Sequence, residues 1–168
     1  MLKNVLAALA IVLVLVAILA APVLADLGEQ PLTATVTVTS YTSVTFADND
    51  AAGLSWGSLT PGAEKQAEAA SPSITITAAA ENNNDVGVYL KGTDFSDGGT
   101  NSFGIANAFY SDTDNSGAAS SMPSDYAGSA WKTLAAGQSV NIYHWLTIPD
   151  TQAAATYTST FTYKTQAE

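Results

Sequence analysis

"TATVTVTSYTSVTF", residues 33–46, alternates polar and apolar residues and contains no charge, no proline and no glycine. In an extended chain its apolar residues share one face: Ala34, Val36, Val38, Val44 and Phe46. A period of two and a high content of β-branched residues predict a half-buried strand, or two strands broken near Ser40.

Four further runs have the composition of strands and start at Ser73, Val86, Ser139 and Ala155: "SITITA", "VGVYL", "SVNIYHWLTI" and "ATYTSTFTYKT". The segments between them are rich in glycine, proline, asparagine and aspartate, which favour turns. No segment after residue 25 sustains an apolar period of 3.6 residues. We therefore expect an all-β fold.

The first 25 residues have the pattern of a secretory signal. Lys3 precedes the apolar run "VLAALAIVLVLVAILA", and Val23 and Ala25 occupy the small-residue positions of a cleavage site. We expect cleavage after Ala25, so that the mature chain begins at Asp26 and the exported protein has no stable membrane anchor. Two alternatives retain the helix: a membrane span, for which the run is just long enough, and a type IV pilin-like subunit whose helix packs in a filament core.

Three regions follow from this pattern: a signal peptide at 1–25, an N-terminal strand region at 26–46 and a β-sandwich body at 47–168. The mature chain of about 143 residues is long enough for a two-sheet antiparallel β-sandwich of jelly-roll or immunoglobulin-like type. Its expected inward-facing residues are Val36, Val38, Ile74, Ile76, Val86, Val88, Leu90, Val140, Ile142, Leu146, Ile148, Phe161 and Tyr163.

The chain is acidic, with five lysines, no arginine and fifteen acidic residues, for a formal net charge of −10. Nucleic acid is not expected as a partner, because phosphate contacts need clustered basic side chains. High negative charge instead keeps an exported protein soluble. The chain has no cysteine, so its stability depends on the core and on neighbouring molecules.

Catalysis has little support in the sequence. His144 is the only histidine, and it shares strand parity with Val140, Ile142 and Leu146, which places it on the apolar face. We expect a packed, hydrogen-bonded histidine rather than a catalytic base, and no enzyme activity.

One short motif resembles a calcium loop. In "DTDNSG", Asp112, Asp114 and Ser116 place oxygen ligands at alternate positions before a glycine. The twelfth position, where a bidentate glutamate is expected, is Pro123. These three residues are the candidate calcium ligands, with a solvated turn as the alternative, and no other cofactor is expected.

Aromatic residues provide an alternative function. Trp131, Tyr143 and Trp145 could stack on sugars, which would make the chain a secreted carbohydrate-binding module. Aromatic rings also anchor protein interfaces, and the sequence does not separate the two uses.

The opening stretch has the properties of a segment that pairs between molecules: high β-propensity, no charge and no proline. It either lies inside its own sheet or leaves the domain and adds a strand to the next subunit. A strand near a chain end can leave without unthreading the fold, and head-to-tail addition builds an open filament. The predicted polymerisation strand comprises Ala34, Thr35, Val36, Thr37 and Val38.

Several segments together resemble the TasA and camelysin class of biofilm fibre proteins and their archaeal bundling-pilus relatives. They are "WGSLTPGAEKQ", "ITITAAAENNNDVGVYLKGTDF" and the final "LAAGQSVNIYHWLTIPDTQAAATYTSTFTYKTQ". The residues that match the family's loop and closing hairpin are Leu59, Pro61, Gly62, Ile148, Pro149, Tyr157 and Phe161.

The resemblance implies a jelly-roll-like sandwich whose copies join by donor-strand complementation into extracellular fibres. These fibres bundle and support adhesion or a biofilm matrix, so the expected partners are other copies of the chain and neighbouring filaments. The protease activity described for camelysins is not implied here, because the sequence holds no matching metal-binding or nucleophilic set.

Overall fold

The structure is a computed structural model that describes residues 35–49 and 53–168. The chain divides into two units, residues 1–38 and residues 39–168. The expected signal peptide at 1–25 and Ala34 of the predicted polymerisation strand lie outside the described residues. In the part of the chain that is described, no helix is long and apolar enough to cross a membrane.

The second unit contains a large sheet in which all pairs of strands are antiparallel. In spatial order its strands are β1 (Val44–Asp48), β3 (Ile74–Ala78), β10 (Ser139–Leu146), β7 (Ala108–Ser111) and β8 (Ser120–Ser121). The short strand β2 (Gln66–Ala67) pairs with the second half of β10. This arrangement leaves β1 at one edge of the sheet.

A second sheet has the order β11 (Phe161–Ala167), β4 (Val86–Gly92) and β9 (Lys132–Leu134). A two-stranded ribbon is made by β5 (Phe95–Ser96) and β6 (Ser102–Phe103). Between Gly53 and Glu168 the helical segments are two short 3₁₀ turns, η1 (Ile105–Asn107) and η2 (Ser116–Ala118).

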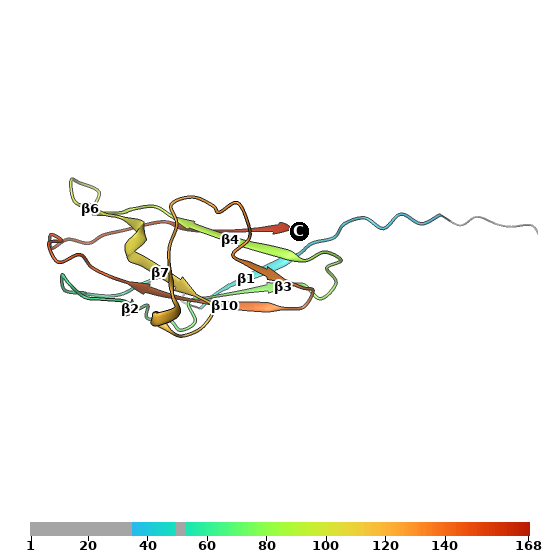
Figure 1. The fold of residues 1–168 in the computed structure, drawn as a ribbon, viewed down its shortest axis with the longest axis horizontal. Helices are drawn as coiled ribbons and strands as arrows, with labels where there is room; N and C mark the ends of the chain where they lie inside the picture. Colours follow the sequence, from blue (N-terminus) through green and yellow to red (C-terminus); the bar gives the residue numbers. More distant parts are fainter. Residues whose placement is uncertain (1–34, 50–52) are drawn as a thin grey trace, which may run out of the picture. The chain divides into compact units, whose positions relative to one another are not determined.

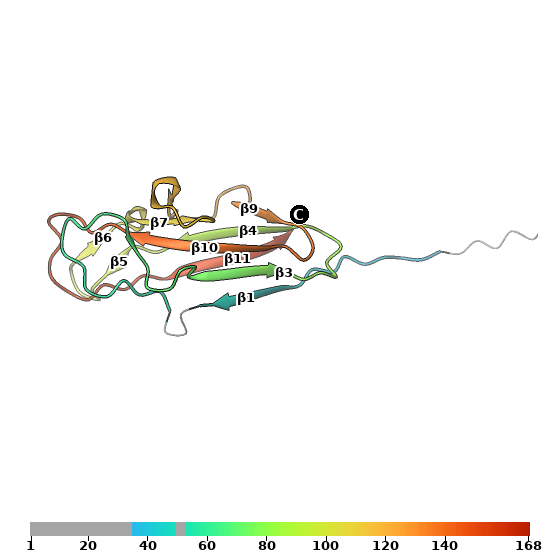
Figure 2. The same cartoon turned by 90° about the horizontal axis from the view of Figure 1, so that it is seen from below.

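The two sheets pack as layers around one core (Figures 1 and 2). The alternating apolar residues of β3, β4 and β10 fill the interior, which confirms the predicted all-β antiparallel sandwich. Its most buried residues include Ile76, Val86, Val88, Leu90, Val140, Ile142 and Leu146, all of them predicted. Ile74, Ile148, Phe161 and Tyr163 pack against this core but are only partly buried.

The sandwich has two opposite ends. At one of them, which we call the root end, β1 and β4 begin and β3 and β11 end, as the pairings of Val44 with Ala78 and of Val86 with Ala167 require. The C-terminus lies at this end (Figure 1). The opposite end carries the loops around β5 and β6 (Figure 2).

The prediction of a strand over residues 33–46 differs from the structure. Residues 35–43 are not in a strand, and β1 begins only at Val44. The assignment of Val36 and Val38 to the core was wrong, because their side chains are 85% and 77% exposed. The reason is that β3 ends at Ala78, opposite Val44, so the strand pairing does not extend to Val36 and Val38.

Candidate functional site

An open groove of about 900 Å³ lies at the end of the sandwich opposite the root end. Loop residues 53–59 and 152–160 provide much of its lining, together with Phe95, Phe103 and residues of β11. Asp48, Ile74 and Leu146 of the large sheet also line it. The groove therefore opens between the edges of the two sheets.

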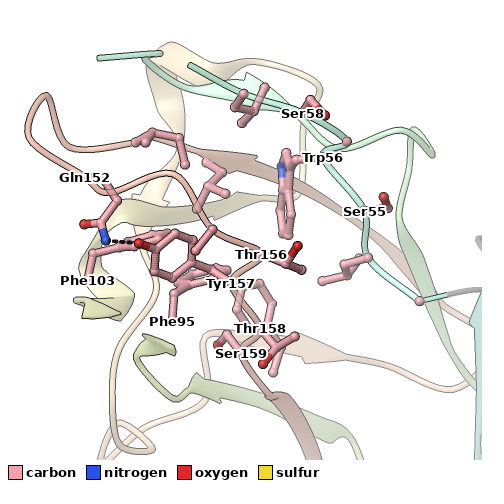
Figure 3. Close-up of a pocket in the computed structure, with 18 of the residues that line it drawn as sticks. Ser55, Trp56, Ser58, Phe95, Phe103, Gln152, Thr156, Tyr157, Thr158 and Ser159 are labelled. Carbon is pink, nitrogen blue, oxygen red and sulfur yellow. Dashed lines mark hydrogen bonds between the residues drawn. The ribbon is translucent and has the colours of Figure 1, made fainter. Parts of the chain in front are cut away.

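The interior of this groove is aromatic. The rings of Phe95 and Phe103 stack with centroids 4.6 Å apart and planes 5° from parallel. Trp56 lies 6.4 Å from Phe95 and 6.2 Å from Phe161, and Tyr157 lies edge-on to Phe103 at 5.2 Å. Figure 3 shows the rings of Trp56, Phe95, Phe103 and Tyr157 with serine and threonine side chains around them. An aromatic groove surrounded by hydroxyl groups can accommodate the apolar side chains of an extended segment whose other face is polar.

Local sequence features shape the groove's loops. Gly62 has a φ of +80°, and a Cβ at this position would lie 2.7 Å from Asp150 Oδ1. The Gly62 N–H donates to the Ile148 carbonyl (2.9 Å), and the Ile148 N–H donates to the Ala63 carbonyl (2.8 Å). The left-handed φ favours glycine at this position, because a side chain there would strain the backbone. The "LTPG" loop and the "IP" segment are thus joined by backbone hydrogen bonds.

A second loop is held by a tyrosine. Gln152 Nε2 donates to the Tyr157 hydroxyl oxygen (2.6 Å; Figure 3), and this hydroxyl donates to the Ala153 carbonyl (2.8 Å). The residues on which the family resemblance rests meet here, because five of them line the groove: Leu59, Pro61, Ile148, Tyr157 and Phe161.

Strand β11 has a free edge beside the groove. The Thr93 N–H donates to the Thr160 carbonyl, and the Glu168 N–H donates to the Asp85 carbonyl. Backbone groups of an antiparallel strand point alternately to its two sides, so the even-numbered residues of β11 face β4. The odd-numbered residues turn their N–H and C=O groups outward: Phe161, Tyr163, Thr165 and Ala167. Within the described residues, no strand pairs with this side of β11.

The inward side chains of β11 are incompletely covered. Phe161, Tyr163 and Thr165 point toward the interior but are only half-buried, whereas their cross-strand neighbours Leu90 and Val88 are buried. A further strand along the edge of β11 would cover these side chains and would pair the outward backbone groups. The second sheet can therefore accept one more strand.

The predicted histidine environment is confirmed. His144 is 2% exposed, and its Nε2 lies 2.8 Å from the Tyr163 hydroxyl oxygen. Burial lowers the pKa of His144 to about 3, so the imidazole is neutral at physiological pH. Burial, with the charges of Asp48 and Glu68, raises the pKa of Tyr163. Both groups pack inside the sandwich, behind the free edge.

Glu68 is a buried carboxylate that organises one groove loop. It is 4% exposed, and its Oε1 and Oε2 accept hydrogen bonds from the Ser55 N–H (3.2 Å) and the Ala70 N–H (3.0 Å). Because both oxygens bond to backbone amides, the side chain positions the chain beside Trp56. This role was not predicted from the sequence, where Glu68 carries no distinguishing pattern.

The predicted polymerisation strand is described from Thr35 onward. In the first unit, residues 35–38 have no assigned secondary structure and are exposed. The alternating threonine and valine side chains of this segment are therefore accessible to another molecule.

The candidate calcium ligands have other partners. Asp112 Oδ2 accepts a hydrogen bond from Lys132 Nζ at 2.6 Å, and this ion pair lowers the pKa of Asp112. Asp114 Oδ2 accepts from the Ser71 hydroxyl at 3.4 Å, and Ser116 begins the turn η2. Over residues 35–49 and 53–168, no three His, Cys, Asp or Glu side chains are grouped as metal ligands.

The candidate sugar-binding aromatics are mostly enclosed. Trp145 is 4% exposed and stacks on Tyr143, with centroids 6.3 Å apart. Trp131 packs edge-on against the buried Tyr110 at 5.2 Å. Tyr143 is half-buried. A flat row of exposed rings, which a sugar would need, is not formed by these three residues.

No protein-family model matches this chain, and no curated protein matches it.

Proposed function

We propose that the protein is a structural subunit of an extracellular filament. Each copy donates its N-terminal segment, ending at Val38, to the free edge of β11 in the next copy. The fibre holds together by main-chain hydrogen bonds and by burial of the donated valines. Such fibres serve bundling, adhesion or a biofilm matrix, as the resemblance to the TasA and camelysin class implies.

One observation carries this proposal: β11 has outward backbone groups and half-buried inward side chains beside an aromatic groove. Val36 and Val38 supply what this edge lacks, because they are apolar, exposed and spaced by two residues. Full burial of each valine contributes about 1.5–3 kcal/mol. Thr35 and Thr37 then form the outer face of the added strand.

The lengths of donor and acceptor also support the proposal. Strand β11 spans Phe161–Ala167, seven residues. In the sequence, Pro31 limits a regular donor strand on its N-terminal side, because proline cannot donate to a ladder. The stretch from 32 to 38, "LTATVTV", matches the length of the acceptor edge.

The donor segment and the groove lie at opposite ends of the sandwich, which favours growth of a linear filament. Thr39, the first residue of the second unit, precedes β1 at the root end, whereas the groove lies at the opposite end. A head-to-tail contact of this type does not close on itself by a two-fold axis, so it extends into a filament. Dissociation is slow when a whole strand must be withdrawn.

The experiment uses negative-stain microscopy of the secreted protein together with N-terminal sequencing of its subunits. The wild-type protein is expected to form fibres whose subunits begin at Asp26. The double change Val36→Asp with Val38→Asp is expected to abolish fibres, because it buries unpaired charge in the acceptor. The matched control, Thr35→Asp with Thr37→Asp, adds the same charge on the outer face and is expected to retain them.

Three outcomes contradict the proposal. Intact fibres from the valine double variant would mean that another contact joins the subunits. A monomer retarded by glycans would indicate the carbohydrate-binding module. Fibre subunits that retain residues 4–25 would identify a pilin-like assembly.

A further inference from the structure

The turn between β3 and β4 contains three consecutive asparagines, and the side chain of Asn83 reaches back to the chain that precedes β1. Asn83 Oδ1 accepts a hydrogen bond from the Tyr41 N–H at 2.8 Å, and its Nδ2 donates to the Thr39 carbonyl at 2.9 Å. The Asn83 N–H also donates to the Tyr41 carbonyl, at 3.3 Å. One residue thus holds three backbone groups that lie more than 40 positions earlier in the sequence.

Asn82 makes the corresponding contacts one step closer to β1. Its Oδ1 accepts from the Ser43 N–H at 2.7 Å, and its Nδ2 donates to the Ser43 carbonyl at 3.0 Å. A side-chain amide carries a donor and an acceptor like a peptide group, so both asparagines imitate a partner strand. They extend the β1–β3 ladder past Ala78, where β3 ends.

The hydrogen bonds stop abruptly on the N-terminal side. Asn84 Nδ2 donates to the Ser40 hydroxyl. Within the described part of the chain, Thr39 is the residue nearest the N-terminus whose backbone is hydrogen-bonded to this turn. Among the described residues, residues 35–38 have no such hydrogen bond. The boundary coincides with the division of the chain between residues 38 and 39.

We infer that Asn82 and Asn83 form a clamp that ends the subunit's own domain at Thr39 and fixes the register of the donated strand. This inference rests on the proposed function. The donor sequence repeats every two residues, so a shift of two positions keeps the valines inward and is weakly resisted by side-chain pattern. The clamp holds residues 39–43 in place and leaves a single attachment point from which the donor extends.

A loose root would also slow assembly. Five residues that are already ordered add no ordering cost when the donor strand binds, whereas a flexible connection must be ordered at that moment. The role of the asparagines is therefore positioning rather than direct contact with the acceptor.

The test compares Asn83→Ala with Asn84→Ala in the full mature chain. Asn83 is exposed, so its loss leaves the sandwich folded, and Asn84 provides a matched control in the same turn. The chain has no cysteine, which permits clean disulfide mapping. Thr37→Cys is combined in turn with Thr162→Cys, Lys164→Cys or Gln166→Cys, all on the outer side of the second sheet, and cross-links between subunits are measured in fibres.

In the wild-type background, one of the three cysteine pairs is expected to dominate. Asn83→Ala is expected to spread the cross-links over two pairs and to slow elongation of wild-type seeds about tenfold. A synthetic peptide of residues 32–38 should bind Asn83→Ala and wild type equally, because the acceptor edge is unchanged. A purely stabilising role would lower the unfolding temperature without changing the cross-link pattern.

Two results overturn the inference and differ in meaning. Wild-type fibres together with an unchanged cross-link pattern and elongation rate in Asn83→Ala overturn the clamp alone. Failure of the wild-type chain to form fibres, with no binding of the peptide, overturns the proposed function and the clamp with it.

Discussion

His144 on β10 and Tyr163 on β11 meet across the interior of the sandwich, with 2.8 Å between Nε2 and the hydroxyl oxygen. The contact joins the central strand of the large sheet to the strand that carries the free edge. Its consequences for stability can be separated into an effect of burial and an effect of the hydrogen bond.

The free energy of unfolding is expected to decrease as the pH is lowered past 6.5, and His144 is the cause. Burial lowers its folded-state pKa to about 3, below the ordinary value of 6.5. Between these values the unfolded chain binds a proton that the folded chain does not, so the free energy of unfolding decreases as pH falls. The slope approaches 1.4 kcal/mol per pH unit, or roughly 2 kcal/mol from pH 7 to pH 5. Urea unfolding at several pH values measures it.

The control for this prediction is His144→Gln, which keeps a hydrogen-bonding side chain but does not titrate. Its stability is expected to be nearly flat between pH 7 and pH 5. An equally steep slope in this variant would assign the pH dependence to the carboxylates instead.

Tyr163→Phe is expected to separate the hydrogen bond from burial. The change removes the hydroxyl and leaves His144 Nε2 without this partner, which costs about 1–2 kcal/mol of unfolding free energy. The pH slope should remain, because desolvation and not the hydroxyl lowers the histidine pKa. A flat pH profile in Tyr163→Phe, measured by the same urea titrations, would show that the hydroxyl is the main cause.

Calcium is expected to compete with Lys132 for Asp112. The ammonium lies 2.6 Å from the carboxylate, and both side chains are partly exposed, so the pair itself contributes at most about 1 kcal/mol. In Lys132→Gln, addition of calcium should raise the unfolding temperature more than it does in wild type. Thermal unfolding with calcium and with a chelator measures the difference, and Asp114→Asn serves as the control that should lose the response. Equal responses in all three proteins would exclude a calcium site at Asp112 and Asp114.

The sandwich could be predicted from local patterns because its longer strands alternate clearly. The parity of the residues around Ile76, Val88 and Ile142 identified the buried faces before any pairing was known. The two-residue strands β2, β5, β6 and β8 are too short to produce a pattern. The same alternation in residues 35–43 did not produce a strand, because the neighbouring strand ends before it reaches them.

The groove could be predicted only in part. The resemblance identified seven residues of the "LTPG" loop and the final hairpin, and five of them line the groove, whereas Gly62 and Pro149 do not. Phe95 and Phe103 come from a turn-rich region, and their stacking with Trp56 nearby depends on pairings between distant segments. The asparagine turn gave no signal beyond turn composition, since hydrogen bonds between Asn83 and Tyr41 depend on the tertiary fold.

The free edge of β11 can be blocked without disturbing the sandwich. Thr165 turns its backbone N–H away from β4, so Thr165→Pro removes no hydrogen bond of the native ladder. The unfolding free energy should change by less than about 1 kcal/mol, while fibre growth and binding of the 32–38 peptide should be lost. The matched change Lys164→Pro removes an N–H that faces β4, leaves the paired carbonyl of β4 without its partner, and should destabilise the monomer by about 1–3 kcal/mol. Normal fibres from a folded Thr165→Pro protein would place strand addition elsewhere, with the exposed edge of β1 as the next site to block.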